Sequence, residues 1–142
     1  MVDIEIIGNP ISLKRHRHSR WGTYDPSKED KKIFAEKVVK KFTQDRPKYK
    51  FLNFPIQGPI IVHINFHIKR PKSHYRTGKY EGIVKDKAPI AHTSKPDIDN
   101  LAKFVLDACN NVLWKDDSII VDLHLVKHYS DKPKTEINIL YV

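Results

Sequence analysis

The strongest constraint on the fold of this chain is a strict alternation of apolar and polar residues from Val62 to Lys69. The apolar positions are Val62, Ile64, Phe66 and Ile68, and the polar positions between them are His63, Asn65 and His67. Because successive side chains of a strand point to opposite faces, this pattern predicts a β-strand from Pro59 to Lys69 with one face in a core. His63 and His67 could ligate a metal, but the strand offers no cysteine or carboxylate partner. We therefore interpret both histidines as residues of a polar sheet face.

Other segments predict the elements that accompany this strand. Apolar runs indicate further strands at 2–7, from 119 to about 127, and at 136–142. A first helix is expected from Asp25, a candidate cap, to Arg46, and a second over 99–112. At 142 residues the chain is long enough for one core but not for two, so we expect a single compact α/β (α+β) domain over 1–142.

Charge is distributed unevenly along the chain. The formal net charge is +9, yet residues 97–122 contain six aspartates against two lysines, a local charge of −4 that leaves +13 for the rest. A basic surface attracts a polyanion by counterion release, and nucleic acid is the commonest such partner. Clustered carboxylates repel phosphate unless a hard divalent cation bridges them, so the contrast suggests phosphate held around a metal.

Two basic segments are the candidate DNA contacts. Their cations are Lys14, Arg15, Arg17 and Arg20 within 12–20, and Lys72, Arg76, Lys79 and Lys95 within 70–95. We expect both segments to be flexible loops that contact phosphates, and the tyrosines of the second to stack on bases or sugars. A solvated charge run is the alternative, and for 12–20 taken alone it is the favoured interpretation.

Residues 95–99, called the acidic segment below, lead into an amphipathic helix. On a helical wheel over 99–112, one side is apolar and the other contains Asp99, Asn100, Lys103, Asp107 and Asn110. Pro96 disfavours helical geometry at Lys95, so we expect an extended entry from Lys95 to Asp99. Such an entry would point Asp97 and Asp99 at one spot beside the helix amino terminus, whose free N–H groups suit a phosphate.

Each acidic pair also has a purely structural interpretation. Asp97 and Asp99 before a helix are often only an N-cap and a helpful second charge, and Asp116-Asp117 alone is more often a turn than a site. Both pairs occur together here, joined by one helix long enough to return the second pair toward the first. Their joint occurrence favours a metal site.

These residues closely resemble the motifs of a known family. The matching segments are Lys95-Pro96-Asp97-Ile98-Asp99-Asn100-Leu101-x-Lys103, Leu106-Asp107-Ala108 and Val112-Leu113-Trp114-Lys115-Asp116-Asp117. They resemble the RusA family of Holliday junction resolvases. The resemblance implies a small mixed β-sheet packed by two main helices, in a protein that works as a homodimer.

The resemblance also implies the members of a catalytic site. Magnesium, with manganese as a substitute, is expected on Asp97, Asp99 and Asp117, with Lys103 assisting. The choice between Asp116 and Asp117 as the third ligand stays open. Asn100 is expected to act as a cap or to support a ligand, and Asp107 to pair with Lys103 at i,i+4.

The implied reaction is a Mg²⁺-dependent, structure-selective cleavage of DNA. Such an endodeoxyribonuclease resolves four-way junctions in recombination and repair by paired symmetric nicks that leave 5′-phosphates. Two alternatives stay open: a non-catalytic basic DNA-binding protein whose acids are only caps, and a nuclease that prefers flaps, forks or RNA.

The sequence gives no indication of a membrane partner. No apolar stretch approaches the roughly 18 residues of a membrane span, and the amino terminus lacks the features of a signal peptide. The single cysteine, Cys109, excludes an internal disulfide and fits a reducing compartment. We expect a cytoplasmic protein of a bacterial or phage-infected cell, associated with the nucleoid.

Overall fold

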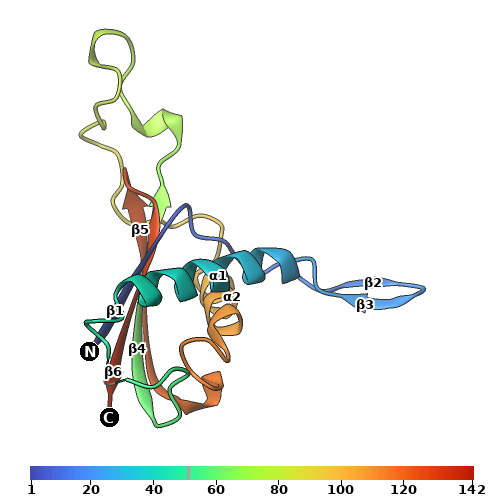
Figure 1. The fold of residues 1–142 in the computed structure, drawn as a ribbon. Helices are drawn as coiled ribbons and strands as arrows, with labels where there is room; N and C mark the ends of the chain where they lie inside the picture. The colour runs from blue at the N-terminus through green and yellow to red at the C-terminus, as the bar shows by residue number, and fades with distance from the viewer. Residues whose placement is uncertain (51) are drawn as a thin grey trace.

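A four-stranded mixed β-sheet forms the centre of the computed structural model, which describes residues 1–50 and 52–142 (Figure 1). Its strands are β1 (Val2–Ile7), β4 (Ile60–Lys69), β5 (Ile120–Ser130) and β6 (Lys134–Tyr141), in the spatial order β1-β6-β4-β5. β6 is antiparallel to both β1 and β4, whereas β4 and β5 are parallel. Parallel neighbours need a long crossover, and this one contains the basic segment 70–95 and the acidic segment.

The core lies between one face of the sheet and two helices, α1 (Lys28–Gln44) and α2 (Ile98–Cys109). All inward residues of β4 are buried, as the alternation predicts: Ile60, Val62, Ile64, Phe66 and Ile68. Phe34 of α1 meets Phe104 of α2 edge to face, with ring centroids 5.7 Å apart. Cys109 has no exposed surface, and burial raises the pKa of its thiol, so it acts as a packing residue. The expected α+β architecture of a mixed sheet and two helices is confirmed.

Both helices begin and end at different residues from those expected. Asp25 Oδ1 accepts the Ser27 N–H at 2.9 Å and forms a turn before α1, so Ser27 rather than Asp25 is the N-cap. α2 begins at Ile98 and ends at Cys109 instead of covering 99–112. The backbone of Asn110 is extended, with a ψ of 132°, and Asn111 follows in a left-handed conformation with a φ of +61°, so the helix ends before Val112.

The basic segments contain more regular structure than expected. Residues 17–24 form an antiparallel hairpin of β2 (Arg17–Ser19) and β3 (Gly22–Tyr24), which projects away from the body beyond the start of α1 (Figure 1). The prediction of a plain loop over 12–20 is therefore wrong at Arg17–Ser19. Segment 70–95 contains two short 3-10 turns, η1 (Lys72–His74) and η2 (Gly78–Tyr80).

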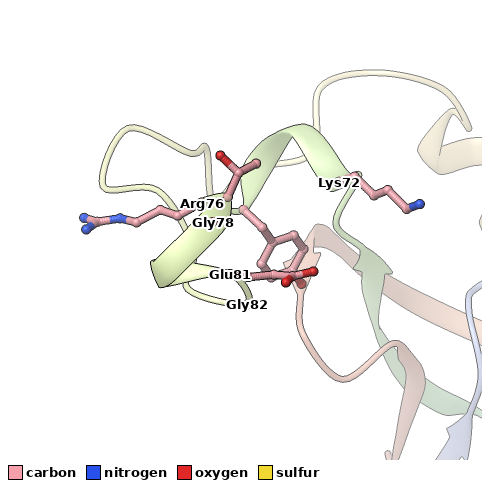
Figure 2. Close-up of a pocket in the computed structure, with 7 residues that line it drawn as sticks. Lys72, Arg76, Gly78, Glu81 and Gly82 are labelled. Atoms are coloured by element: carbon pink, nitrogen blue, oxygen red, sulfur yellow. The ribbon is translucent and has the colours of Figure 1, made fainter.

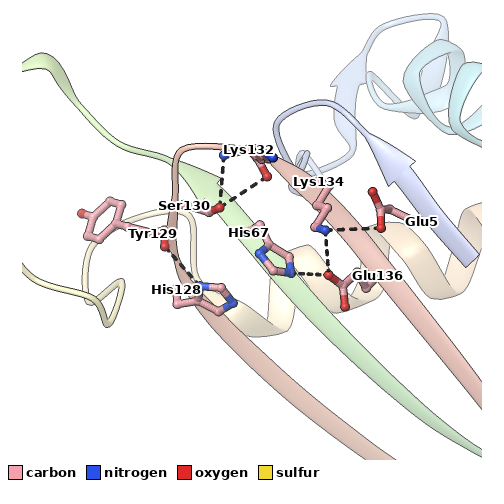
Figure 3. Close-up of polar contacts among 8 residues, drawn as sticks. All are labelled: Glu5, His67, His128, Tyr129, Ser130, Lys132, Lys134 and Glu136. Atoms are coloured by element: carbon pink, nitrogen blue, oxygen red, sulfur yellow. Dashed lines mark hydrogen bonds and ion pairs between the residues drawn. The ribbon is translucent and has the colours of Figure 1, made fainter. Parts of the chain in front are cut away.

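The second face of the sheet is polar. Its histidine pairs are His63 with His124 and His67 with His128, whose ring centroids lie 5.2 and 4.4 Å apart. His67 Nε2 also lies 2.7 Å from Glu136 Oε1, and Lys134 lies between Glu136 and Glu5 (Figure 3). Polar pairs therefore connect all four strands across this face. Among the described residues, none of the helices has the length and apolar character needed to cross a membrane.

Candidate functional site

The first acidic pair lies at the amino terminus of α2. Asp97 is the N-cap residue, with extended backbone angles of φ −70° and ψ 146°, and its carboxylate makes no capping hydrogen bond. Asp99 already lies in the first helical turn, so the predicted extended entry from Lys95 to Asp99 ends at Asp97. The physical reason is that an N-cap needs only one residue of extended backbone before the helix begins. Both carboxylates are exposed.

Lys103 pairs with Asp99 rather than with Asp107. Lys103 Nζ lies 3.7 Å from Asp99 Oδ2, one turn back along α2. Asp107 instead lies 3.6 Å from Lys31 Nζ of α1, and Lys31 also contacts Asp25. Because a lysine on the neighbouring helix is within reach of Asp107, the predicted Lys103–Asp107 pair does not form. Asp107 thus connects the two helices.

The second acidic pair follows a rigid turn after α2. Trp114 is fully buried and donates its indole N–H to Asn110 Oδ1 at 3.0 Å. Backbone hydrogen bonds on both sides of Trp114 join this turn to Ile56. The turn therefore fixes the position at which the chain leaves the core, just before Asp116 and Asp117.

Asp116 and Asp117 have different surroundings. Asp116 is the N-cap of η3 (Asp117–Ile119), and its Oδ2 accepts the Ser118 N–H at 3.2 Å. Hydrogen bonding to Ser118 holds the pKa of Asp116 below its usual value. Asp117 is half-buried and does not cap this turn, so its carboxylate is the more available of the two for binding a metal ion.

The carboxylates do not form a closed metal cage in one chain. Within the described ranges 1–50 and 52–142, no group of three or more His, Cys, Asp or Glu residues is placed to hold a metal ion. The structure brings together Asp97, Asp99 and Lys103 at one helix end, while Asp117 lies on a separate element. The two α2 carboxylates still suit Mg²⁺, because Mg²⁺ commonly takes one or two carboxylates and keeps several waters.

Lys127 is a candidate functional residue that the sequence reasoning missed. From β5, its Nζ donates to the backbone carbonyls of Ser94 and Pro96, each at 2.9 Å. It therefore ties the acidic segment to the sheet one residue before Asp97. The sequence signal for it is the alternation of β5: Lys127 lies two residues after Leu125 and therefore on the same, inward face of the strand.

A cluster around Tyr129 fixes the end of segment 70–95 that leads to Asp97. His92 packs edge to face on Tyr129 at 4.8 Å, and Ser94 Oγ lies 3.3 Å from the Tyr129 hydroxyl. Burial and the nearby Lys127 lower the pKa of His92. Arg70 donates to the Pro89 carbonyl at 2.8 Å and closes the base of the loop.

The predicted DNA-binding cations lie mainly on the surface. Those exposed are Lys14, Arg15, Arg17, Arg20, Lys72, Lys79 and Lys95, and Arg76 is half-buried. Lys72 and Arg76 line a hollow of about 510 Å³ with Glu81 and extend to opposite sides of it (Figure 2). Arg76 forms an ion pair with Asp86, with 3.1 Å between Arg76 Nη2 and Asp86 Oδ1. This hollow lies within segment 70–95, and none of the site carboxylates lines it.

Two comparisons relate the chain to known proteins. A family model described as "Endodeoxyribonuclease RusA" matches residues 8–140. The chain is also 34% identical over 142 residues to the "Uncharacterized protein YqaN" of Bacillus subtilis (strain 168), a match that covers 97% of this chain and 94% of the relative. The matched region includes both acidic pairs and both basic segments.

Proposed function

The chain belongs to the RusA family of endodeoxyribonucleases, and from that premise we propose that it resolves four-way DNA junctions by divalent-metal-dependent hydrolysis. The observation that supports this best is that the carboxylate of Asp97 does not cap the helix. It occupies the N-cap position yet makes no capping hydrogen bond, which argues against a purely structural role. Asp99 lies on the first turn of α2 and Lys103 on the second, so an acid pair and a cation surround one helix end.

We propose Asp97, Asp99 and Asp117 as the metal ligands. All three supply the hard oxygen atoms that Mg²⁺ or Mn²⁺ prefers, and Asp116 is the weaker candidate because it caps η3. A bound ion would supply polarisation of the scissile phosphate and a more acidic water nucleophile. Asn100 and Asp107 would support the site through the backbone and through α1.

The chain's own groups have defined tasks around the scissile phosphate. The N–H groups of the first turn of α2 have no helical acceptor, so they are free to bind a phosphate oxygen. Lys103 is placed to offset negative charge that develops in the transition state. Lys127 holds the segment before Asp97 at a constant position.

We further propose that the protein acts as a homodimer on branched DNA. Resolution of a junction needs two matched nicks in strands related by a two-fold axis, and a symmetric dimer presents two equivalent sites. The cations of 12–20 and 70–95 would bind the arms of the junction. The nicks are expected to leave 5′-phosphates, in the cytoplasm of a bacterial or phage-infected cell.

The variant Asp97→Asn tests the catalytic assignment. It removes one negative charge and one metal ligand, so Mg²⁺-dependent cleavage should fall to background while junction affinity is retained or increases. Asp122→Asn is the matched control, because Asp122 is an exposed aspartate of β5 that belongs to neither acidic pair. Unchanged cleavage by Asp97→Asn would favour a DNA-binding protein whose acids are only caps.

Substrate choice needs a separate comparison. Cleavage of a mobile four-way junction, a flap, a replication fork, a linear duplex and an RNA strand should be measured with the same enzyme in Mg²⁺. Faster cleavage of the junction is the expected result. Equal rates on all of them would leave an endonuclease without junction selectivity.

A further inference from the structure

The tip of the β2–β3 hairpin exposes a tryptophan to solvent. Trp21 is 85% exposed, whereas the only other tryptophan, Trp114, is fully buried in the core. The hairpin projects from the body (Figure 1), and each residue from Lys14 to Tyr24 is exposed. Nothing in the core explains the position of Trp21, because the hairpin packs no apolar surface around it.

The hairpin tip combines an aromatic face with cations. The Arg20 guanidinium lies 4.7 Å from the centroid of the Trp21 ring, within cation–π range. Within the described part of the chain, Lys14, Arg15, Arg17 and Arg20 have no carboxylate within ion-pair distance. Their charges are therefore available to an external anion.

Local hydrogen bonds define the shape of the tip. The backbone N–H of Trp21 donates to Ser19 Oγ at 3.2 Å, and the Ser19 hydroxyl donates to the Gly22 carbonyl at the same distance. Gly22 has a φ of +121°, which closes the turn in a conformation that other residues rarely adopt. The tip thus has a formed turn although it is not packed against the body.

The segments on both sides of the hairpin are connected to α2, the second of them through Lys31. On the incoming side, the Leu13 N–H donates to the Asn100 carbonyl at 3.0 Å, next to Asp99. On the outgoing side, Asp25 contacts Lys31, which also lies 3.6 Å from Asp107. Contact at the hairpin is therefore linked to the helix that presents Asp97 and Asp99.

We propose that Trp21 stacks on a base exposed at the branch point of the DNA, while the hairpin cations bind the flanking phosphates. This inference rests on the proposed function, since it concerns how the same site recognises its substrate. Inside a linear duplex, base faces are covered by their neighbours. At a branch point, a face can be uncovered and stack on an aromatic ring, so Trp21 would favour branched over linear DNA.

Binding without cleavage tests this proposal. The full chain is titrated in EDTA with a four-way junction and with a linear duplex of the same length, using Trp21→Ala and Trp21→Phe. Trp21→Ala should weaken junction binding about tenfold, the scale of one lost base–aromatic stack, and change duplex binding much less. Trp21→Phe keeps an aromatic face and should retain most of the affinity. Tyr24→Ala is the matched control, because Tyr24 is an exposed aromatic away from the tip.

Fluorescence supplies a second readout. Junction DNA should quench the emission of the wild type, and the quenching should disappear in Trp21→Phe, whose remaining tryptophan is buried Trp114. Unchanged Trp114 emission also shows that the variant is folded. A 2-aminopurine at the branch point should respond to wild type but not to Trp21→Ala, and one in the middle of an arm should respond to neither.

Several results would overturn the proposal. These are equal loss of junction and duplex affinity in Trp21→Ala, a Trp21→Phe variant that binds the junction as weakly as Trp21→Ala, and a blue shift of Trp21 emission with vesicles of anionic phospholipid that equals the shift with junction DNA.

The proposed function fails by a different set of results. Loss of cleavage in Asp97→Asn with normal binding by Trp21→Ala would leave the nuclease assignment and remove the stacking role. Normal cleavage by Asp97→Asn with selective loss in Trp21→Ala would do the reverse.

Discussion

At the scale of single residues, Lys127 is the side chain that joins the sheet to the acidic segment. Its ammonium group donates to two backbone carbonyls, those of Ser94 and Pro96. Hydrogen bonds from a charged donor are stronger than those between neutral groups. A single long side chain therefore sets the position of the chain immediately before Asp97.

The variant Lys127→Met should separate this positioning role from a binding role. Methionine keeps much of the side-chain bulk but removes both hydrogen bonds. We expect kcat to fall about tenfold to a hundredfold, because small misplacements of catalytic groups are costly, while the Kd for junction DNA measured in EDTA changes little. Lys132→Met, an exposed lysine in the turn before β6, is the control for loss of one positive charge. Equal kinetics in the two variants would contradict the assignment of Lys127.

The sequence identifies the candidate site residues, but it does not identify the partners that these residues have in the structure. The spacing of Lys103 and Asp107 allows an ion pair along α2, yet Lys103 pairs with Asp99 and Asp107 with Lys31. The choice depends on where α1 crosses α2, which residue spacing does not contain. Lys127 was missed for the same reason, because its acceptors are carbonyls of a distant loop.

At the scale of elements, the polar face of the sheet links its strands through histidine. His67 on β4 contacts His128 on β5 and lies 2.7 Å from Glu136 on β6 (Figure 3). Burial lowers the pKa of His67 against the opposing effect of Glu136, and the neighbouring His128 and Lys134 lower it further. The folded protein therefore binds a proton at His67 less readily than the unfolded chain does.

This shift gives the fold a pH dependence of known sign. Stability from neutral His67 is fully present above the unfolded pKa of about 6.5 and is lost as pH falls toward the lower folded pKa, because the unfolded state binds more protons there. The free energy of unfolding in urea should thus decrease from pH 7.5 to pH 5.5. His67→Gln should flatten that decrease, whereas His18→Gln on the exposed hairpin should leave it unchanged. A steeper decrease in His67→Gln would show the opposite sign.

Elements with a strong periodic pattern were predictable, and their ends were less so. The alternation in β4 predicts its buried residues correctly. The expected apolar side of the second helix is buried at Leu101, Phe104, Val105 and Ala108, whereas Val112 lies beyond the helix and is half-buried. The end of α2 depends on the extended Asn110 and the left-handed Asn111, and the length of β5 depends on its pairing with β4 up to Ser130. The β2–β3 hairpin was missed because its strands are short, basic and exposed, so they lack an apolar period.

At the scale of the whole molecule, the basic and acidic parts occupy different regions. The hairpin and segment 70–95 extend from the body in different directions (Figure 1), and α2, which follows segment 70–95 in the chain, belongs to the body. This arrangement suits a substrate with several arms better than a single straight duplex. One chain nonetheless supplies one acidic site, and junction resolution needs two.

Mixing active and inactive chains tests the proposed dimer. Wild type and Asp97→Asn are combined, allowed to exchange subunits, and assayed on a supercoiled plasmid with an extruded cruciform. Paired nicks within one complex linearise the plasmid, while a single nick gives an open circle. Because a mixed dimer has only one complete site, the mixture should accumulate open circles that wild type alone does not. Wild type mixed with Asp122→Asn should still give linear product. A mass equal to one chain at the concentrations that cleave, together with open circles from wild type alone, would show independent monomers.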